Sequence, residues 1–339
     1  MSWLPVFLME SHRLIPDGKS FNNFNLYKSL NNSAMTNLDR HTFSGSIFIF
    51  MKSIISELNA SGRYRTAESY TSTLRSLQTY MKNEDLPFSS IDHMLVKKYE
   101  NYLSAKGITK NSSSFYLRIF RAVYNRATEN GLSHFTTPHP FSGVYTGIDK
   151  TVKRAVSIDT ISSIKRLDLT LDPSLGFARD MFMFSFYTRG MSLIDMAYLR
   201  KCDVKDGMIS YSRRKTGKRL FIKIEKCMTD IINRHNIPAS PYLLPIISPS
   251  PEPRKQYLNA SHLINKKLKK IGEMVSCGTV LTMYVARHSW ASVARIKEIP
   301  ISVISEGMGH SSETITRIYL DSINNCIIDR ANLSIIESI

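Results

Sequence analysis

Four short segments in the second half of the chain bring together residue types that can bind and attack a phosphate. The segment FYTRGMSLIDMAYL holds Arg189 and, six residues later, Asp195. A strongly basic stretch, RRKTGKR, holds Arg213 and Lys215. The segments TMYVARHSWAS and GMGHSSETITRIYLDS complete the set with Tyr284, Arg287, His288, His310 and Tyr319.

These residue types suit phosphoryl chemistry. Arginine presents a planar, permanently charged fork that binds phosphate through two hydrogen bonds, and lysine adds a point charge that can also donate a proton. A tyrosine beside such a cluster can be a covalent nucleophile, because the same positive charge stabilises its phenolate. Any one of these residues alone is more often a surface, salt-bridge or core residue. The order of the segments and their spacing, 23 residues from Arg287 to His310 and 9 from His310 to Tyr319, indicate a site.

The four motifs in this order resemble the tyrosine recombinase (phage integrase) family. The resemblance is strong over residues 155–325, and residues 45–130 are similar to the family's SAM-like core-binding domain. The phrases YTRGMSLIDMAYL and MGHSSETITRIYLDS look most like recombinases of mobile elements and invertible regions in Bacteroides-type bacteria. The resemblance implies a mainly α-helical fold, in which an α-rich catalytic domain with a small antiparallel sheet follows the SAM-like domain.

The resemblance also implies roles for individual residues. Tyr319 matches the nucleophile that attacks a DNA phosphodiester and forms a 3′-phosphotyrosyl intermediate. Lys215 matches the general acid that protonates the leaving 5′-oxygen. Arg287 would hold non-bridging oxygens as charge develops, and His310 would add a hydrogen bond. Such a site needs neither a metal ion nor ATP, because the phosphotyrosine bond conserves the energy of the broken bond.

Two positions depart from the family pattern. Tyr284 stands where the second motif usually has histidine, and the adjacent His288 can serve in part. Asp195 falls on the family's acidic residue, but that alignment puts serine at the usual place of the first arginine. We prefer Arg189, one helical turn earlier, for that role, and Arg213 is the second candidate.

Charge and composition agree with a DNA partner. The 339 residues include 45 Lys and Arg against 28 Asp and Glu, a formal net charge of +17. Such an excess points to a polyanion, although solubility or membrane adhesion would also account for it. The four cysteines lie far apart, which argues against a disulfide framework or a zinc ribbon. No apolar run is long enough to span a membrane, and residues 1–20 show no secretory signal pattern. We expect a cytoplasmic, nucleoid-associated bacterial protein.

The length suggests about two domains. We expect a loosely structured segment over residues 1–40, a helical core DNA-binding domain over 41–135, a linker over 136–153, a catalytic domain over 154–322 and a C-terminal interaction tail over 323–339. Several polar and basic residues of the helical domain lie near helix starts, where phosphates bind readily. The expected DNA-binding residues in both domains are Arg63, Tyr64, Arg65, Lys110, Asn111, Ser112, Arg214 and Lys218.

The pattern of the catalytic domain predicts the elements that position its motifs. Residues 157–167 read as a helix capped by Ser157, and residues 177–187 as a helix buried on all sides. Alternation over residues 208–224 around Thr216-Gly217 predicts a hairpin with a basic tip. The stretch LLPIISPSPEPRK reads as a loop, and helical patterns return from Tyr257 onward.

We therefore interpret the chain as a site-specific recombinase that clamps duplex DNA between its domains. It would act as a homo-tetramer on paired sites, with the tail docking on a neighbouring protomer. An accessory DNA-bending protein is a further possible partner. Integration, excision and inversion all remain open as outcomes. Two other functions stay open as alternatives: a type IB topoisomerase, which uses the same covalent step as a monomer, and a DNA-binding protein with impaired catalysis.

Overall fold

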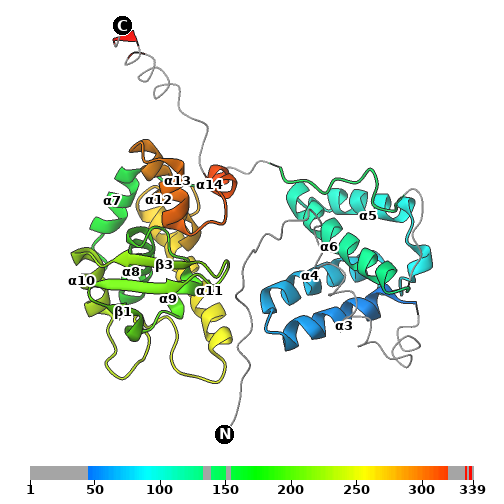
Figure 1. Ribbon diagram of the computed structural model, residues 1–339, viewed down its shortest axis with the longest axis horizontal. Coiled ribbons are helices and arrows are strands. Elements are labelled where there is room, and N and C mark those ends of the chain that lie inside the picture. Colours follow the sequence, from blue (N-terminus) through cyan, green and yellow to red (C-terminus); the bar gives the residue numbers. More distant parts are fainter. Residues whose placement is uncertain (1–44, 133–138, 150–153, 320–332, 334–335, 338–339) are drawn as a thin grey trace, which may run out of the picture. The chain divides into compact units, whose positions relative to one another are not determined.

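The computed structural model describes residues 45–132, 139–149, 154–319, 333 and 336–337 (Figure 1). The chain divides into two compact units, residues Met1–Lys150 and Thr151–Ile339. Both are built mainly of helices, and the second carries a small antiparallel sheet. The predicted fold class is therefore confirmed. The predicted N-terminal segment 1–40 lies outside the described residues, as do most of the tail 323–339 and part of the linker.

The described residues of the first unit form four helices and one 3-10 turn. The helices are α3 (Ile47–Ala60), α4 (Tyr64–Tyr80), α5 (His93–Ala105) and α6 (Lys110–Glu129), and the 3-10 turn covers Phe88–Ser90. Three of the helices begin at a capping side chain, because Ser46, Asp92 and Thr109 accept a hydrogen bond from a backbone N–H of the first turn.

Aromatic side chains fill the core of this unit. Phe50, Tyr99, Phe120 and Tyr124 are all buried. The Tyr99 hydroxyl forms a hydrogen bond of 2.7 Å with Ser76 Oγ, so the polar end of the side chain has a partner within the core. Burial raises the pKa of the Tyr99 phenol, so this side chain does not titrate near neutral pH.

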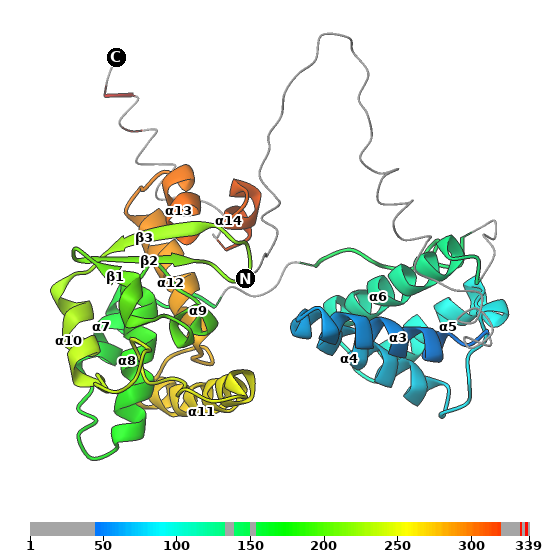
Figure 2. The same cartoon turned by 60° about the horizontal axis from the view of Figure 1, so that its bottom comes forward.

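Helices surround a three-stranded sheet in the second unit (Figure 2). In chain order the elements are α7 (Ile158–Arg166), α8 (Pro173–Tyr187), α9 (Leu193–Ala197), a 3-10 turn (Lys201–Asp203), β1 (Val204–Lys205), β2 (Met208–Ser212), β3 (Arg219–Lys223), α10 (Lys226–Arg234), α11 (Pro253–Met274), α12 (Met283–Ile296), α13 (Ile301–Met308) and α14 (Glu313–Tyr319). Ser157 caps α7, as predicted.

The hairpin is present where the alternation predicts it. Strands β2 and β3 pair antiparallel, with Tyr211 opposite Leu220 and Ile209 opposite Ile222. The loop between them, residues 213–218, is called the basic loop below. Two boundaries differ from the prediction. Helix α11 begins at Pro253, inside the stretch read as a loop, because proline fits the first helical turn. Helix α8 begins at Pro173, four residues before the apolar run, because Asp172 caps it.

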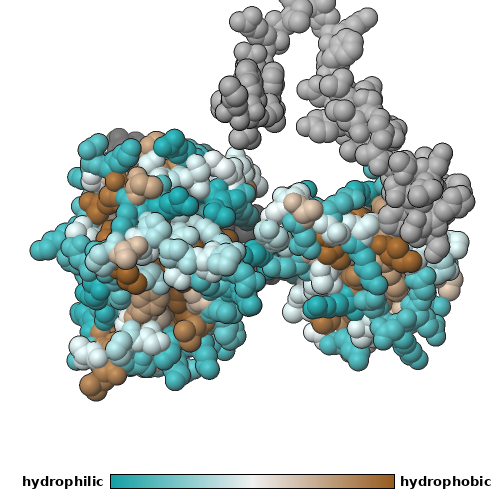
Figure 3. Space-filling model, turned by 90° about the horizontal axis from the view of Figure 1, so that it is seen from below, coloured by the Kyte–Doolittle hydropathy of each residue, from teal (hydrophilic) through white to brown (hydrophobic). Residues whose placement is uncertain are grey.

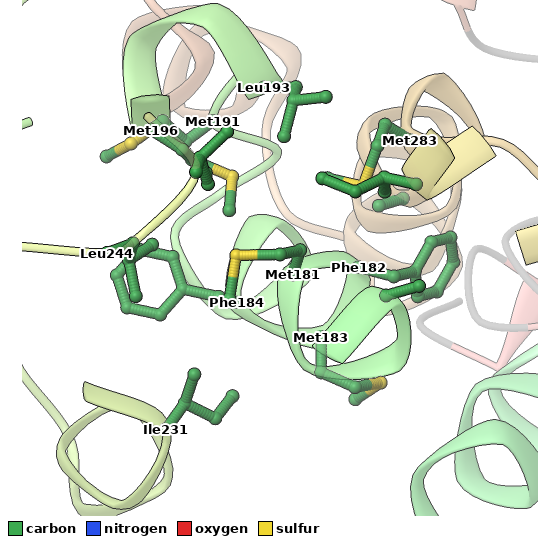
Figure 4. Packing of buried hydrophobic residues seen from close by; sticks show 14 of the residues in the cluster. Met181, Phe182, Met183, Phe184, Met191, Leu193, Met196, Ile231, Leu244 and Met283 are labelled. Atoms are coloured by element: carbon green, nitrogen blue, oxygen red, sulfur yellow. The ribbon is translucent and has the colours of Figure 1, made fainter. Parts of the chain in front are cut away.

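Helix α8 is the centre of the second unit's core. It packs against α10, α11 and α12, and its side chains Met181, Phe182, Met183 and Phe184 point into different neighbours around the helix (Figure 4). This all-round burial confirms the interpretation of its apolar run as core packing. The outer surface seen in Figure 3 is mostly hydrophilic on each unit, with scattered hydrophobic patches.

One charged residue of α8, Asp180, is buried and is hydrogen-bonded by three side chains. Asp180 binds Arg179 Nε at 3.0 Å, Arg234 Nη1 at 2.6 Å and His235 Nε2 at 2.8 Å. Burial alone would raise the pKa of this carboxyl, but the hydrogen bonds from His235 and Arg234 hold it below its usual value. The cluster therefore fastens the end of α10 to α8.

Candidate active site

Arg287 lies at the start of α12 and is almost completely buried. Its Nη1 donates to Gly190 O at 2.6 Å, and its Nη2 donates to Met308 O at 2.7 Å. The same Nη2 lies 2.8 Å from His310 Nε2. These contacts come from two separate parts of the chain, the turn at Gly190 and the segment from Met308 to His310, so the guanidinium is held in one orientation before any ligand arrives.

Gly190 makes this arrangement possible. Its φ is +74°, and a Cβ placed there would lie 2.8 Å from Arg287 Cα and 2.7 Å from Cγ. Only glycine combines that backbone conformation with that close an approach.

His310 follows the left-handed residue Gly309, which ends α13 with φ +65°. The imidazole is buried, and its Nδ1 lies 2.8 Å from Thr316 Oγ1 on α14. Burial, together with the cations Arg287, Arg213, Lys215 and Lys218, lowers the pKa of His310 to about 3. The ring is therefore neutral at physiological pH.

Arg213 joins this pair from the sheet. It continues the inward-facing alternation of Ile209 and Tyr211 along β2, and it is 6% exposed. Its Nη1 donates to Gly309 O at 2.9 Å. Both arginines thus bind carbonyls of the segment 308–309, next to His310. We call Arg213, Arg287 and His310 the Arg–His cluster.

The basic loop is held at its base and exposed at its tip. Thr216 Oγ1 also donates to Gly309 O, at 3.4 Å, and Lys218 Nζ binds Glu306 at 2.6 Å. Lys215 is exposed, and it is among the cations that lower the pKa of His310. The loop therefore carries an exposed ammonium group next to the Arg–His cluster. Arg214 is exposed and stacks on the Tyr198 ring, with its Cζ 4.0 Å from the centroid.

Asp195 holds the basic loop through a hydrogen bond to its backbone. It is buried, accepts from the backbone N of Arg214 at 2.9 Å, and accepts from Ser192 Oγ at 2.6 Å. Ser192, the residue at the usual place of the first arginine, caps α9. The two side chains together tie α9 to the hairpin, which is a positioning role.

Arg189 lies elsewhere. It has a positive φ of 60°, and its Cδ packs 3.5 Å from the Cβ position of Gly307. It lines a groove of about 720 Å³ with Leu220, Phe221 and Trp290, rather than hydrogen-bonding the segment 308–309. The structure thus brings Arg213, and not the residue preferred from the sequence, to the Arg–His cluster. The physical reason is the hairpin, which places Arg213 opposite Gly309, 96 residues away in the chain.

Helix α12 also carries two further candidates from the sequence, Tyr284 and His288. Tyr284 is about half exposed, and its ring meets the His288 ring edge-on with centroids 4.4 Å apart. His288 itself is buried. The two residues lie one turn apart on the helix that holds Arg287.

Tyr319 is the last residue of α14. This short helix packs against α12 and α13, and Ile315 contacts the small apolar cluster of Ala291, Ala294, Ile304 and Met308. The helix is thus seated on the two elements that supply Arg287 and the segment leading to His310.

Three positions in the site were missed by sequence reasoning. Gly190 and Gly309 show no signal beyond their residue type, since their importance depends on close approaches from distant segments. Thr316, fully buried beside His310, resembles any polar residue of a short amphipathic helix.

The polar candidates of the first unit lie at helix starts, as predicted. Arg63 precedes α4, which begins at Tyr64, and the side chain of Arg65 is 90% exposed. Lys110 begins α6 and binds Asp149 at 3.3 Å. Ser112 lies in the same first turn, where its backbone N–H donates to the capping Thr109.

Asn111 has a different place. Its amide donates to Asp149 O at 3.0 Å and accepts from Asp149 N at 2.7 Å. The side chain therefore holds the segment around Asp149 against α6.

Within the described parts of the chain, no three His, Cys, Asp or Glu side chains are grouped so that they could hold a metal ion. None of the helices described is both long and apolar enough to cross a membrane.

Residues 46–137 match the family model of the phage integrase SAM-like domain. No curated protein matches the chain. Among solved structures, it is similar to a lambda integrase dimer bound to a COC′ core site, with 14% identity and a TM-score of 0.63 over 81% of this chain and 98% of that one. A lambda integrase tetramer bound to a Holliday junction gives 14% identity and a TM-score of 0.62, covering 89% of this chain and 87% of that one.

A third similar structure is the Tn1549 transposon integrase in complex with a circular intermediate DNA. Here the identity is 14% and the TM-score 0.62, over 84% of this chain and 99% of that one. At this level of identity the similarity establishes the fold, which is that of the integrases, with a SAM-like first domain and an α-rich second domain.

Proposed function

We propose that this protein is a tyrosine site-specific recombinase that cleaves and rejoins duplex DNA through a 3′-phosphotyrosyl intermediate. The observation that carries the proposal is the Arg–His cluster. Two buried arginines and a buried neutral histidine converge on one segment, next to an exposed lysine loop and to the helix that ends at Tyr319. The fold shared with integrases solved on DNA supports the same proposal.

Each residue has a distinct part in the proposed reaction. The Tyr319 phenol releases its proton to solvent as its oxygen attacks the scissile phosphorus. The bond from phosphorus to the 5′-oxygen of the next nucleotide breaks, and that oxygen takes a proton from Lys215. Arg287 and Arg213 stabilise the charge on the non-bridging oxygens in the transition state. Attack by a free 5′-hydroxyl then reverses the step and reseals a strand. No bond energy is lost to water, so the cycle requires neither ATP nor a metal ion.

Arg213 serves as the first arginine in this proposal. It is buried beside His310, whereas Arg189 packs on Gly307 in a separate groove. Removing a preorganised donor from a charge-stabilising site costs about 10²–10³ in rate. We expect Arg213→Ala to lose cleavage by that factor and Arg189→Ala to retain it. Cleavage that survives Arg213→Ala and is lost in Arg189→Ala would reverse the assignment.

The remaining charge belongs to the DNA surface. Most of the +17 net charge would neutralise backbone phosphates, which gives salt-sensitive binding of low sequence specificity. Arg63, Tyr64, Arg65, Lys110 and Ser112 in the first unit, with Arg214 and Lys218 in the basic loop, are the residues we assign to this role. Asn111 belongs to the same set, because its amide uses only one of its two N–H groups on Asp149.

Strand exchange between two sites requires more than one protomer. Dimers and tetramers occur among the similar integrase structures, and we assign the tail from residue 323 onward to docking on a second copy. The apolar groove lined by Leu220, Phe221 and Trp290 is the seat we assign to it. Integration, excision and inversion are all compatible outcomes, and junctions of mobile elements and invertible regions are the first DNA to test.

The test of the proposed function starts from the DNA. Sequencing junctions that rearrange when the protein is expressed identifies the recombination site. A nicked suicide substrate carrying that site then traps the covalent intermediate, because the short cleaved strand diffuses away. Wild type should give a denaturation-resistant protein–DNA adduct, and Tyr319→Phe should give none. Tyr257→Phe on α11 is the matched control and should behave as wild type. An adduct formed by Tyr319→Phe would refute the assigned nucleophile.

A further inference from the structure

Thr316 connects the helix of the proposed nucleophile to the histidine of the Arg–His cluster. It lies on α14, three residues before Tyr319, and its side chain is completely buried. Its hydroxyl oxygen is 2.8 Å from His310 Nδ1.

The direction of this hydrogen bond follows from the other side of the ring. Arginine has only donors, so the 2.8 Å contact between Arg287 Nη2 and His310 Nε2 requires Nε2 to accept. A neutral imidazole carries one proton, which must then be on Nδ1. In the DNA-free protein, His310 Nδ1–H therefore donates to Thr316 Oγ1.

A scissile phosphate requires the opposite arrangement. Non-bridging phosphate oxygens only accept hydrogen bonds, so His310 can bind one through Nε2 only if Nε2 carries the proton. The Arg287 Nη2–H that Nε2 accepts in the DNA-free protein must then donate to the phosphate instead. Four cations, Arg287, Arg213, Lys215 and Lys218, disfavour a second proton on the ring. The route that adds no charge releases one proton from Nδ1 to solvent and takes one from solvent onto Nε2. Nδ1 then needs a donor, and a threonine hydroxyl can donate as well as accept.

We propose that Thr316 is a positioning residue that reverses its hydrogen bond to His310, so that the ring can present Nε2–H to the scissile phosphate while staying fixed to α14. The inference rests on the proposed recombinase function. It makes the seating of α14, and hence of Tyr319, a condition for the phosphate-binding state of His310. An aliphatic residue at 316 would keep the packing and lose the reversal.

Three variants separate this role from packing. Thr316→Val keeps the shape of the side chain and removes the hydroxyl, and Thr316→Ser keeps the hydroxyl. Thr314→Val makes the same chemical change at an exposed position of the same helix. DNA affinity, measured for each variant by gel shift, should stay at the wild-type value, because Thr316 is buried and touches no DNA.

The first measurement is made on the DNA-free full chain by nitrogen-15 NMR of the histidine rings, with His310 assigned from His310→Gln. Wild type and Thr316→Ser should show a protonated, slowly exchanging Nδ1 on His310, and Thr316→Val should lose that protection. A wild-type proton on Nε2, or unchanged protection in Thr316→Val, would overturn the inference. This result does not depend on any recombinase activity.

The second measurement is single-turnover adduct formation on the suicide substrate. Thr316→Val should be slower by about tenfold, equal to about 1.4 kcal/mol of transition-state stabilisation, while Thr316→Ser and Thr314→Val stay near wild type. Equal rates in Thr316→Val and wild type, or a rate loss in Thr316→Val that tracks a loss of DNA affinity, would overturn the positioning role alone. Absence of any adduct in wild type would instead refute the proposed function.

Discussion

Substituting Gly190 by alanine tests whether the position of Arg287 depends on a close backbone approach. Gly190 and Gly207 share nearly the same backbone conformation, with φ of +74° and +72°. A Cβ on Gly207 would meet nothing within 4 Å, whereas a Cβ on Gly190 would lie 2.8 Å from Arg287 Cα and 2.9 Å from Cβ. The two alanine variants therefore share the backbone cost and differ in the contact with Arg287.

The magnitudes follow from these two terms. A left-handed conformation costs a non-glycine residue about 1–2 kcal/mol, which is the whole effect expected for Gly207→Ala. Forcing extra atoms into a packed region costs about 1–3 kcal/mol more, and Gly190→Ala should be destabilised by that additional amount. The atoms that the new Cβ would meet include the backbone Cα of Arg287, so Arg287 must move. Because misplacing a catalytic group by 1 Å can cost about 10²-fold, cleavage should fall by a factor of that order.

Urea denaturation of both variants measures the stability difference, and single-turnover adduct formation measures the cleavage rate. Gly207→Ala should cleave at a near wild-type rate despite its lower stability, since Gly207 lies in the turn between β1 and β2. The reasoning would be refuted if the two variants were equally stable, or if Gly190→Ala cleaved as fast as Gly207→Ala.

Three further predictions concern stability and DNA binding. The pKa of Asp180 is lower in the folded than in the unfolded protein, so its carboxylate stabilises the fold above the unfolded-state pKa, and this stability is lost as the pH falls through the folded-state pKa. In Asp180→Asn, the free energy of unfolding measured in urea should therefore fall less steeply on the acid side of the pH profile. An acid side identical to wild type would contradict this. Asp195→Ala should destabilise by about 1–3 kcal/mol in urea, because it leaves the buried polar groups around α9 and the hairpin without their acceptor; full wild-type stability would argue against that support. Arg65→Ala should lower the slope of log affinity against log salt by about 1, and an unchanged slope would remove Arg65 from the DNA surface.

Local sequence patterns predict much of this fold. The hairpin follows from strict alternation on both sides of Thr216-Gly217, and the start of α7 follows from the capping residue Ser157. Strand β1, by contrast, has two residues, too few for an alternating pattern to be recognised. The early start of α8 depends on a cap that stands outside the apolar run. The boundary of a helix depends on a single capping contact. The existence of the helix or strand depends on a hydrophobic pattern that recurs along it.

The candidate site is less accessible from sequence. Motif order identifies Arg287, His310 and Tyr319 as a set, but no local signal distinguishes Arg189 from Arg213. That choice depends on the contact of Arg213 with Gly309, which exists only once the hairpin has folded against α13. Thr316 is a similar case, because its significance lies in a hydrogen bond that fixes a tautomer. Contacts between distant segments of this kind leave no periodic trace in the sequence.

The central claim is that Tyr319 becomes covalently linked to DNA. Mass spectrometry of the adduct trapped on a suicide substrate, after digestion by protease and nuclease, measures this directly. We expect a peptide from the end of α14 in which Tyr319 carries a 3′-linked nucleotide, together with a free 5′-hydroxyl on the released strand. A nucleotide attached to any other residue, or a 5′-phosphate on the released strand, would contradict it.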